Sequence, residues 1–424
     1  MEFAESSVKW ERYVQGLKRL FLVLAVALLL LGSYGLFQRM FRGHLNANYG
    51  SVVTWGLWVA TYIYFIGLSA GAFLISSLVY VFNVRRFERV GRPAVMTALI
   101  TLFLALLSIV FDLGHMERSW YVMVYPNFKS PMAWMIWLYS AYSLILLGEL
   151  WFLLRRDLVL EGSQPGLRGR LYRVLALGSR DTSKAGAQRD RKIVRALATV
   201  GVPVAVMFHG GVGALFGVVS ARPHWHSGLF PILFLLSALV SGGSLLAVAG
   251  FIFKNGWQDN GDTVVGLGRL VLGLLLLDVL FQVSEFLVAF RGGIPGHIAG
   301  LKLVISGPYW GVFWGWQVVV GTLIPILLLT LPTRDKPVYV AIAGVLIAAG
   351  FFGLRLNIVI PGLAVEEIEG FSRAFVSMRT SSHYFPSLSE WSLTAGIVGL
   401  GLLLFALGEW LLPSQKEEED VCVG

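Results

Sequence analysis

Residues 206–239 read VMFHGGVGALFGVVSARPHWHSGLFPILFLLSAL, two long apolar runs with a single polar break between them. The break holds Arg222, His224 and His226, and one further histidine, His209, lies inside the first run. Each run has the length and composition of a membrane-spanning helix, so the stretch predicts two spans joined by a short basic hairpin. An ionisable group at membrane depth is unfavourable unless it has a partner or a function, which makes His209 a candidate site residue.

The composition places the whole chain in the membrane class. Of its 424 residues, 56% are hydrophobic and 14% are charged, whereas soluble domains carry about 25% charged residues. The 14 Trp and 14 Tyr residues are typical of the belts that amphipathic rings form at membrane interfaces. The single cysteine, Cys422, excludes a cysteine-ligated metal or iron–sulfur site and an internal disulfide. We therefore expect an all-α integral membrane protein.

Uncharged or nearly uncharged runs predict ten transmembrane helices. The first run, Leu20–Phe37, follows a polar and basic segment and precedes no small-residue cleavage site. We therefore expect an uncleaved first span rather than a signal peptide. The second run, 52–84, exceeds the ~20 residues that a bilayer requires, which predicts a tilted or extended helix. The other runs cover residues 93–113, 131–154, 194–219, 228–253, 264–290, 307–331, 338–355 and 390–412.

The distribution of Lys and Arg predicts the orientation. With the N-terminus inside, the inner segments hold 24 and the outer segments hold 10 of the 34 basic residues, and such a bias marks the cytoplasmic side. We therefore expect a multi-pass protein of the cytoplasmic (inner) membrane with both termini in the cytoplasm, and no nucleic-acid partner. The longest inner loop, 155–193, is rich in Arg, Gly, Ser and Gln. We expect it to be mobile and to face anionic lipid headgroups, with docking of a partner as the alternative.

Ionisable residues in or near the spans are the candidates for chemistry. Six of the seven histidines fall in outer loops or at outer span ends, and none lies near the inner face. The acids are Glu149 in the fourth span, Asp112 at the outer end of the third, and Asp278 and Glu285 on one face of the seventh. Carboxylates inside a bilayer pair, become neutral or relay protons. A protonated carboxylate hydrogen-bonded between helices is the structural alternative for each.

The motifs that the sequence lacks narrow the chemistry. An intrinsic haem b usually needs two facing histidines as axial ligands, and only His209 lies deep enough in the membrane. The sequence therefore does not predict a haem bound by this chain. The sequence has no phosphate-binding glycine loop, no HExxH metal motif and no nucleophile elbow. Intramembrane acids and histidines without cofactor ligands favour a quinone site, in which proton donors face the carbonyl oxygens and apolar side chains hold the ring and tail.

Four stretches resemble a known family. They are DLGHMERSW at 112–120 with SPMAW at 130–134, ALFGVVSARPHWH at 214–226, RLNIVIPG at 355–362, and YFPSLSEW at 384–391. In this order they are similar to the NrfD/PsrC family of integral membrane subunits, the polysulfide reductase membrane subunits among them, over about residues 50–412. The likeness is to the longer, ten-span branch, which includes the membrane subunit of periplasmic nickel–iron hydrogenase 2 and subunits of sulfite-reduction and alternative complex III assemblies.

The resemblance implies a fold and partners. Spans two to five and six to nine would form two four-helix bundles, flanked by spans one and ten. A quinone site on the outer side would lie close to a ferredoxin-like subunit with iron–sulfur clusters. That subunit would exchange electrons with a molybdopterin, hydrogenase or multihaem cytochrome subunit. The arginine-rich inner loop departs from the family pattern. The resemblance indicates neither the soluble partner nor the direction of electron flow.

Together these features predict a quinone-reactive membrane subunit of a multi-subunit respiratory oxidoreductase, with proton translocation left open. Menaquinone or ubiquinone would be the substrate, and this chain would bind no metal or haem. Of the acids, Asp278, Glu285 and Glu149 would relay protons toward the inner side. The residues expected to be catalytic are Asp112, His115, Glu149, His209, Asp278 and Glu285. The residues expected to bind the quinone are Arg222, His224, Trp225 and Tyr384.

Two other functions remain open at this point. An ion-coupled secondary transporter could use the same acids as coupling sites, although the sequence contains no convincing internal repeat. A purely structural membrane anchor would use them as packing groups. The expected divisions of the chain are an N-terminal segment with the first span, a first bundle with the basic loop, a second bundle, and an outer segment with the tenth span and an acidic tail. They cover residues 1–51, 52–219, 220–355 and 356–424.

Overall fold

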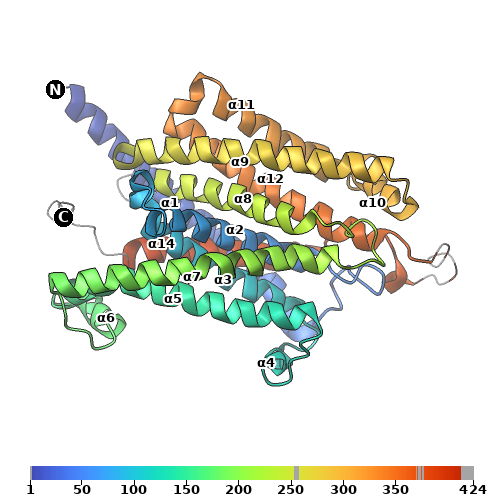
Figure 1. The fold of residues 1–424 in the computed structure, drawn as a ribbon, viewed down its shortest axis with the longest axis horizontal. Helices are drawn as coiled ribbons and strands as arrows, with labels where there is room; N and C mark the ends of the chain where they lie inside the picture. The colour runs from blue at the N-terminus through green and yellow to red at the C-terminus, as the bar shows by residue number, and fades with distance from the viewer. Residues whose placement is uncertain (1, 253–256, 369, 371–373, 375–376, 412–424) are drawn as a thin grey trace.

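The computed structural model describes residues 2–252, 257–368, 370, 374 and 377–411. The expected acidic tail and Cys422 lie outside the described residues. Figure 1 shows long helices that run side by side, roughly along the longest axis of the molecule. Throughout the described residues the regular structure is helical, and ten helices are long and apolar enough to cross a membrane. The predicted all-α fold and the predicted number of spans are therefore confirmed.

The spans begin and end where local chemistry favours it. Proline is the first residue of α5, α10 and α12, because its missing N–H would be unpaired at a helix start in any case. The short helices are α4 (Tyr121–Val124), α6 (Leu167–Leu175) and α10 (Pro295–Ile305). The long helices are α1 (Glu2–Arg42), α2 (Leu57–Tyr80), α3 (Glu88–Asp112), α5 (Pro131–Gly162), α7 (Lys184–Gly217), α8 (Phe230–Ile252), α9 (Trp257–Arg291), the π-helix η3 (Gly311–Leu323) with α11 (Ile324–Thr330), α12 (Pro337–Ala364) and α14 (Leu388–Leu411).

Two expectations about the spans are wrong in detail. The second span is α2, a helix of 24 residues, because residues 52–56 and 81–84 of the run lie outside the helix. The ninth span continues to Ala364 instead of ending at residue 355. Arg355 and Asn357 interrupt the apolar run there, yet both are buried inside the protein and are hydrogen-bonded to other helices.

The basic inner segment is also more ordered than its composition predicts. Instead of a mobile loop over residues 155–193, the helices α5, α6 and α7 take up most of this segment. A buried ion pair fixes it, in which Arg155 lies 2.6 Å from Asp190. The same guanidinium donates to the Ser179 hydroxyl and to the Asp181 carbonyl. These contacts give hydrogen-bond partners to Nε and Nη1 of a charge that a loop would have left in water.

The helices pack in two connected groups. Among the first four described spans after α1, α2 contacts α3 and α7, and α5 contacts α3 and α7. In the second half of the chain, α8 contacts α9 and α12, and α12 also contacts η3, α11 and α9. The two groups are also in extensive contact with each other, because α2 packs against α8 and α12 and α7 packs against α8. Helices α1 and α14 pack against each other, and α14 borders α3 (Figure 1).

The two groups approach closely where α2 crosses α8. A Cβ atom built on Gly71 would lie 1.9 Å from the Ala238 carbonyl oxygen, and one on Gly242 would lie 2.5 Å from the Ala72 nitrogen. Only glycine fits at these two positions, because the backbones themselves are in contact. One turn before Gly71, Gly67 of α2 faces His209 and Arg355, two of the polar residues described below.

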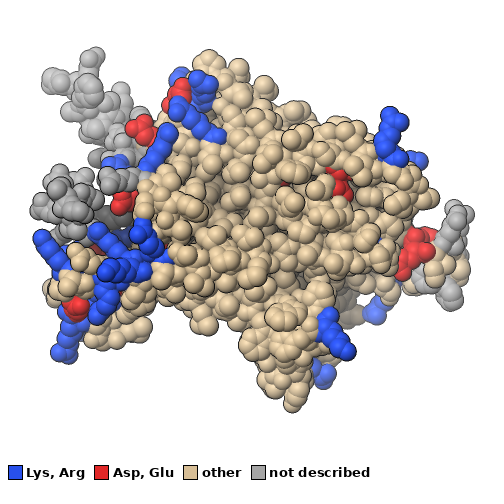
Figure 2. All heavy atoms as spheres, in the orientation of Figure 1, with Lys and Arg blue, Asp and Glu red and all other residues tan. Residues whose placement is uncertain are grey.

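The molecule has two distinct ends. One end, here called the α6 end, carries α6 and the start of α7, and the opposite α10 end carries α10, the segments 43–56, 113–130 and 218–229, and the described residues of 365–387. Lys and Arg side chains gather at the α6 end, while the middle of the visible surface is almost free of charge (Figure 2). Many exposed leucines, valines and tryptophans cover that middle zone, as expected for a surface that faces lipid.

Candidate functional site

A cavity of about 80 Å³ lies between α8, α9, α10, η3 and α12. Its walls are largely apolar and include Phe230, Phe234 and Leu301. Phe286 and Phe313 stack against each other in the wall, with ring centroids 5.5 Å apart. The polar side chains that line the cavity are His224, Ser237, Asp278, Gln282, Glu285, His297, Gln317, Arg355 and Asn357.

A chain of side-chain amides holds one acid of this cavity. Asn357 donates to Gln317 at 2.8 Å, Gln317 donates to Gln282 at 2.9 Å, and Gln282 donates to Asp278 Oδ2 at 2.5 Å. Asp278 Oδ1 is buried and has no hydrogen-bond partner among the described residues. Gln317 lies in the π-helix η3, a rare conformation that is frequent at functional sites. The chain fixes one carboxylate oxygen and leaves the other for a water, a proton or a ligand.

Glu285 and two histidines form the other polar side of the cavity. Glu285 lies seven residues after Asp278 on α9, on the same face, and accepts a hydrogen bond from Ser227 at 2.9 Å. The rings of His224 and His297 are nearly perpendicular, with centroids 6.2 Å apart. Burial, and then the neighbouring His297, lower the pKa of His224 to about 4 against the opposing hydrogen bond of the Asn357 backbone.

His297 is affected in the same direction. Burial lowers its pKa, and the negative charge of Glu285 opposes that effect. Because a lowered pKa favours the neutral imidazole, both His224 and His297 are neutral near pH 7. A neutral imidazole can accept a proton from a ligand in the cavity.

Arg355 lines this cavity and His209 lies beside it, where the two helix groups meet. Arg355 donates to the Ser237 hydroxyl at 2.6 Å, and its guanidinium lies 4.6 Å from the centre of the Phe234 ring. His209 Nε2 lies 2.8 Å from the Phe234 carbonyl oxygen. Since that oxygen only accepts, Nε2 carries the hydrogen, and the buried Nδ1 has no partner among the described residues. A Cβ atom on Gly67 would lie within 3.6 Å of both side chains.

Asp112 and Tyr384 belong to a different polar cluster at the α10 end. The Tyr384 hydroxyl donates to Glu390 and accepts from the Leu57 N–H at 2.8 Å. Burial, and then the charge of Glu390, raise the pKa of Tyr384 well above its ordinary value, so it stays a neutral donor. Asp112 Oδ1 is buried without a partner in the described structure. Arg39 lies next to it and donates to the carbonyls on either side, those of Phe111 and Leu113.

Arg222 and Trp225 attach the hairpin 218–229 to α12. Arg222 forms an ion pair with Glu367 at 2.9 Å and donates to two carbonyls at the end of α12. The Trp225 indole donates to the Ile358 carbonyl at 2.7 Å and stacks on Trp55, with centroids 5.7 Å apart. Neither side chain lines the cavity, although both hold His224 in its place between them.

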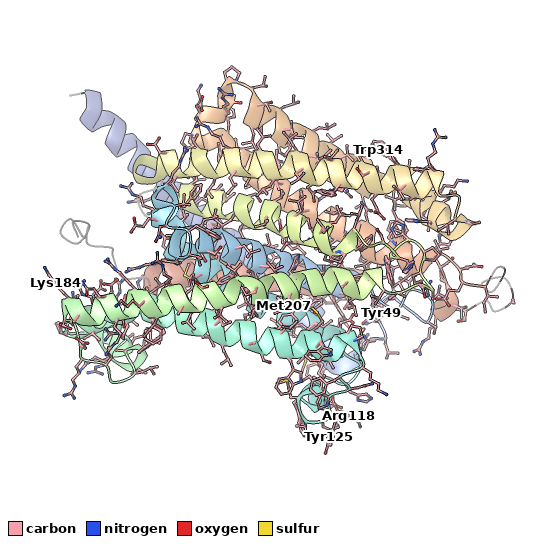
Figure 3. The ribbon with its side chains drawn as sticks, in the orientation of Figure 1. Tyr49, Arg118, Tyr125, Lys184, Met207 and Trp314 are labelled. Carbon is pink, nitrogen blue, oxygen red and sulfur yellow. The ribbon has the colours of Figure 1, made fainter. Side chains whose placement is uncertain are left out.

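The remaining two expected site residues lie apart from the cavity. His115 is exposed and pairs with Glu117 at 2.9 Å, in the projecting segment that Arg118 and Tyr125 mark in Figure 3. Glu149 is fully buried in α5, and neither of its carboxylate oxygens has a hydrogen-bond partner among the described residues. The structure therefore brings His224, Asp278 and Glu285 together, places His209 next to them, and separates Asp112, His115, Tyr384 and Glu149 from them.

Several cavity residues were not predicted. Gln282 lies between the two acids of α9 at helical spacing, and Arg355 and Asn357 interrupt an otherwise apolar run. These were usable signals, because polar residues inside a span face other helices more often than lipid. His297, which lines the cavity, gave no signal beyond its residue type.

Ten long apolar helices in the described residues define a multi-pass integral membrane protein, and its cavity with ionisable side chains is a candidate site for a small molecule or for protons. The family profile described as "Polysulphide reductase, NrfD" matches residues 45–366 of the chain. The chain belongs to the NrfD family, which confirms the resemblance seen in its sequence motifs.

Relatives cover almost the whole chain. It is 36% identical to a selenate reductase subunit of Mesobacillus selenatarsenatis, over 96% of both chains. It is 32% identical to a putative dimethyl sulfoxide reductase membrane subunit of Halobacterium salinarum, over 94% of this chain and 92% of the relative. An Hdr-like menaquinol oxidoreductase integral membrane subunit of Archaeoglobus fulgidus is 29% identical, over 87% of this chain and 88% of the relative.

Proposed function

We propose that this chain is the quinone-reactive membrane subunit of a respiratory oxidoreductase and that the cavity between α8, α9 and α12 takes the quinone head group. The observation that carries the proposal is the combination of apolar aromatic walls with Asp278, Glu285 and His224 in one cavity. Aromatic and aliphatic walls suit a ring and an isoprenoid tail, and the few polar groups suit its two oxygens. The names of the relatives, one of them a menaquinol oxidoreductase subunit, support menaquinone as the substrate over ubiquinone.

The chemistry that we propose is the exchange of two protons and two electrons with a quinol. Each quinol O–H that is oxidised gives its proton to a base, and the two electrons leave to an acceptor outside this chain. His224 suits the first role by its position, because its imidazole lines the cavity and its Nδ1 has no partner among the described residues. Glu285 suits the second, because Ser227 already orients its carboxylate. In the direction of quinone reduction the same groups would return these protons.

The size of the cavity sets a condition on this proposal. Its volume of about 80 Å³ has room for several waters but is smaller than the ~300 Å³ at which typical ligand pockets begin. We therefore expect the walls to widen when the ring enters. The surface helix α10, which contributes His297 and Leu301 to the wall, is the shortest helix around the cavity and the one that we expect to move.

A proton relay would extend from this cavity. We propose that Asp278 exchanges protons with the cavity through its free oxygen, while the amide chain holds its other oxygen. His209 and Arg355 would continue the polar route to the interface of the two helix groups. Glu149 would serve the α6 end, with waters bridging the gap, since no hydrogen bond joins it to the cavity in the described structure. Asp112 and Tyr384 would handle protons at the α10 end.

The arrangement in the membrane is part of the proposal. The contacts of α2, α3, α5 and α7, and those of α8, α9, η3 and α12, support two four-helix bundles flanked by α1 and α14. We propose that the divisions near residues 51, 219 and 355 separate these units, although α12 continues past the last of them. The excess of basic residues at the α6 end supports placing that end, with both termini, in the cytoplasm.

The proposed partners follow from the same orientation. A ferredoxin-like subunit with iron–sulfur clusters would dock at the α10 end, where the hairpin 218–229 and α10 cover the cavity. That subunit would exchange electrons with the enzyme that consumes or supplies them, a molybdopterin, hydrogenase or multihaem subunit. The names of the relatives, which include selenate and dimethyl sulfoxide reductase subunits, favour the molybdopterin alternative.

Bound quinone tests the proposal. The complex should be purified with native lipid, extracted, and its quinone quantified per protein for the wild type and for the double variant His224→Gln with Glu285→Gln. We expect quinone in the wild type and a loss of most of it in the double variant. Glu117→Gln is the matched control, because Glu117 is an exposed acid at the same end. Ion-coupled uptake of a solute by proteoliposomes, without bound quinone in the protein, would favour a transporter. If the protein neither binds quinone nor transports a solute, a purely structural anchor would be favoured.

A further inference from the structure

Helix α6 has an exposed apolar face that nothing in the described fold covers. The side chains of Tyr172 and Ala176 pack against Leu158 of α5 and form a small separate core. On the opposite face, Leu167 is 80% exposed and Val174 is 70% exposed. These two residues are seven apart, so they share one face of the helix. A soluble surface rarely combines such exposure with so short a helix unless another apolar phase covers it.

Arginines flank this apolar face. Arg170 and Arg173 are exposed, and no carboxylate lies within 4.0 Å of either in the described part of the chain. They are three residues apart, which places them on the same flank of the helix. Unpaired cations on one flank of an apolar stripe form the pattern of a helix that lies in a membrane interface.

The surroundings of α6 are strongly cationic. Residues 155–195 contain 11 Lys and Arg but only four Asp and Glu. Three of the four acids are already engaged, because Asp157 pairs with Arg92, Asp181 with Arg189 and Asp190 with Arg155. Few charges of this segment therefore remain to neutralise the excess. Figure 2 shows the resulting concentration of Lys and Arg at this end, and Lys184 in Figure 3 marks where α7 begins beside α6.

Contacts with two spans place α6 at the level of the membrane border. The Trp151 indole of α5 donates to the Leu175 carbonyl at 3.0 Å. The Tyr172 hydroxyl donates at 2.9 Å to the carbonyl of Leu411, the last residue of α14. The Arg168 guanidinium lies 5.5 Å from the centre of the Trp410 ring. Tryptophan and tyrosine settle at the interface between hydrocarbon and water, so α6 lies beside the ends of the spans and not beyond them.

We propose that α6 is a binding site for anionic phospholipid. Leu167 and Val174 would enter the upper acyl region, while Arg170 and Arg173 would bind the headgroup phosphate. A soluble protein partner would satisfy the arginines but would leave the apolar stripe facing lipid, so lipid explains both observations. The site does not depend on the proposed quinone chemistry, because it lies at the end of the molecule opposite α10.

Lipid retention tests the site through the arginines. The full-length protein would be placed in nanodiscs of phosphatidylcholine with added phosphatidylglycerol, and its bound lipid measured by native mass spectrometry. Each Lys or Arg near an anionic surface contributes about 1 kcal/mol, which is about fivefold in affinity. Arg170→Gln with Arg173→Gln should therefore bind phosphatidylglycerol about 30-fold more weakly. The control, Arg291→Gln with Lys302→Gln, removes the same charge at the α10 end and should have no such effect. Equal lipid retention in both double variants would overturn the proposal.

Depth measurements test the apolar stripe separately. Val174→Cys in a Cys422→Ser background would carry a fluorescent label, and quenching would be compared between spin-labelled lipid and a water-soluble quencher. We expect quenching mainly by the lipid. Quenching mainly from water, or protection from both quenchers by a co-purified protein, would show that α6 faces solvent or a protein partner and would overturn the lipid site.

Discussion

His224 should make the protein less stable in mild acid, and its replacement should remove that effect. Burial and the neighbouring His297 lower the pKa of His224 from 6.5 to about 4. The folded protein therefore resists protonation of this ring, while the unfolded chain takes up a proton at about pH 6.5. Stability is fully present above pH 6.5 and decreases as the pH falls toward 4, because the unfolded state then binds more protons.

The magnitude follows from the two pKa values. Each pH unit between them is worth about 1.4 kcal/mol, so the loss reaches about 2 kcal/mol at about pH 5 and about 3 kcal/mol below about pH 4. His224→Gln keeps a polar side chain in the cavity wall but cannot titrate. Between about pH 7.5 and pH 5, the wild type should therefore lose about 2 kcal/mol more of its free energy of unfolding than His224→Gln.

Denaturant titration in mixed micelles at several pH values measures this difference. His383→Gln is the matched control, because His383 is exposed and its variant should follow the wild type. If the wild type and His224→Gln lose the same stability over this range, His224 is not held neutral by its surroundings. The reasoning that burial keeps this ring uncharged in mild acid would then be refuted.

Glu149→Gln should lower proton uptake at the α6 end of oriented proteoliposomes while quinone binding persists, because both oxygens of this buried acid lack a partner in the described structure; unchanged pH-indicator traces and turnover would contradict the relay. Gly71→Ala should lower the free energy of unfolding in detergent by at least ~2 kcal/mol through overpacking, because its Cβ would meet the α8 backbone. The control variant Gly273→Ala, whose added Cβ has nothing within 4 Å, should elute as a normal monodisperse protein. Membrane-impermeant thiol reagents should label Ser163→Cys only from the cytoplasm and Ala221→Cys only from outside, and labelling in the opposite sense would reverse the orientation.

Local sequence features were sufficient for the number of spans and for the family. A run of about 20 apolar residues must become a helix in lipid, because no water is available to hydrogen-bond its backbone. The seven-residue spacing of Asp278 and Glu285 also predicted that they share a face of α9, and both line the same cavity. The local pattern gave the wrong helix length where a polar residue interrupts an apolar run. At Arg355, for example, the helix continues because the side chain has a buried hydrogen-bond partner on α8.

Only the tertiary structure decided which polar residues meet. The amide chain from Asp278 to Asn357 joins side chains of α9, η3 and α12, and nothing in the local sequence of these helices specifies that contact. Asp112 and His115 are three residues apart, yet Asp112 ends α3 in a buried cluster while His115 is exposed on the next segment. Helical periodicity fixes the face of a helix on which a side chain lies. The choice of helix that packs on that face depends on close approaches such as that of α2 and α8, which bring distant segments together.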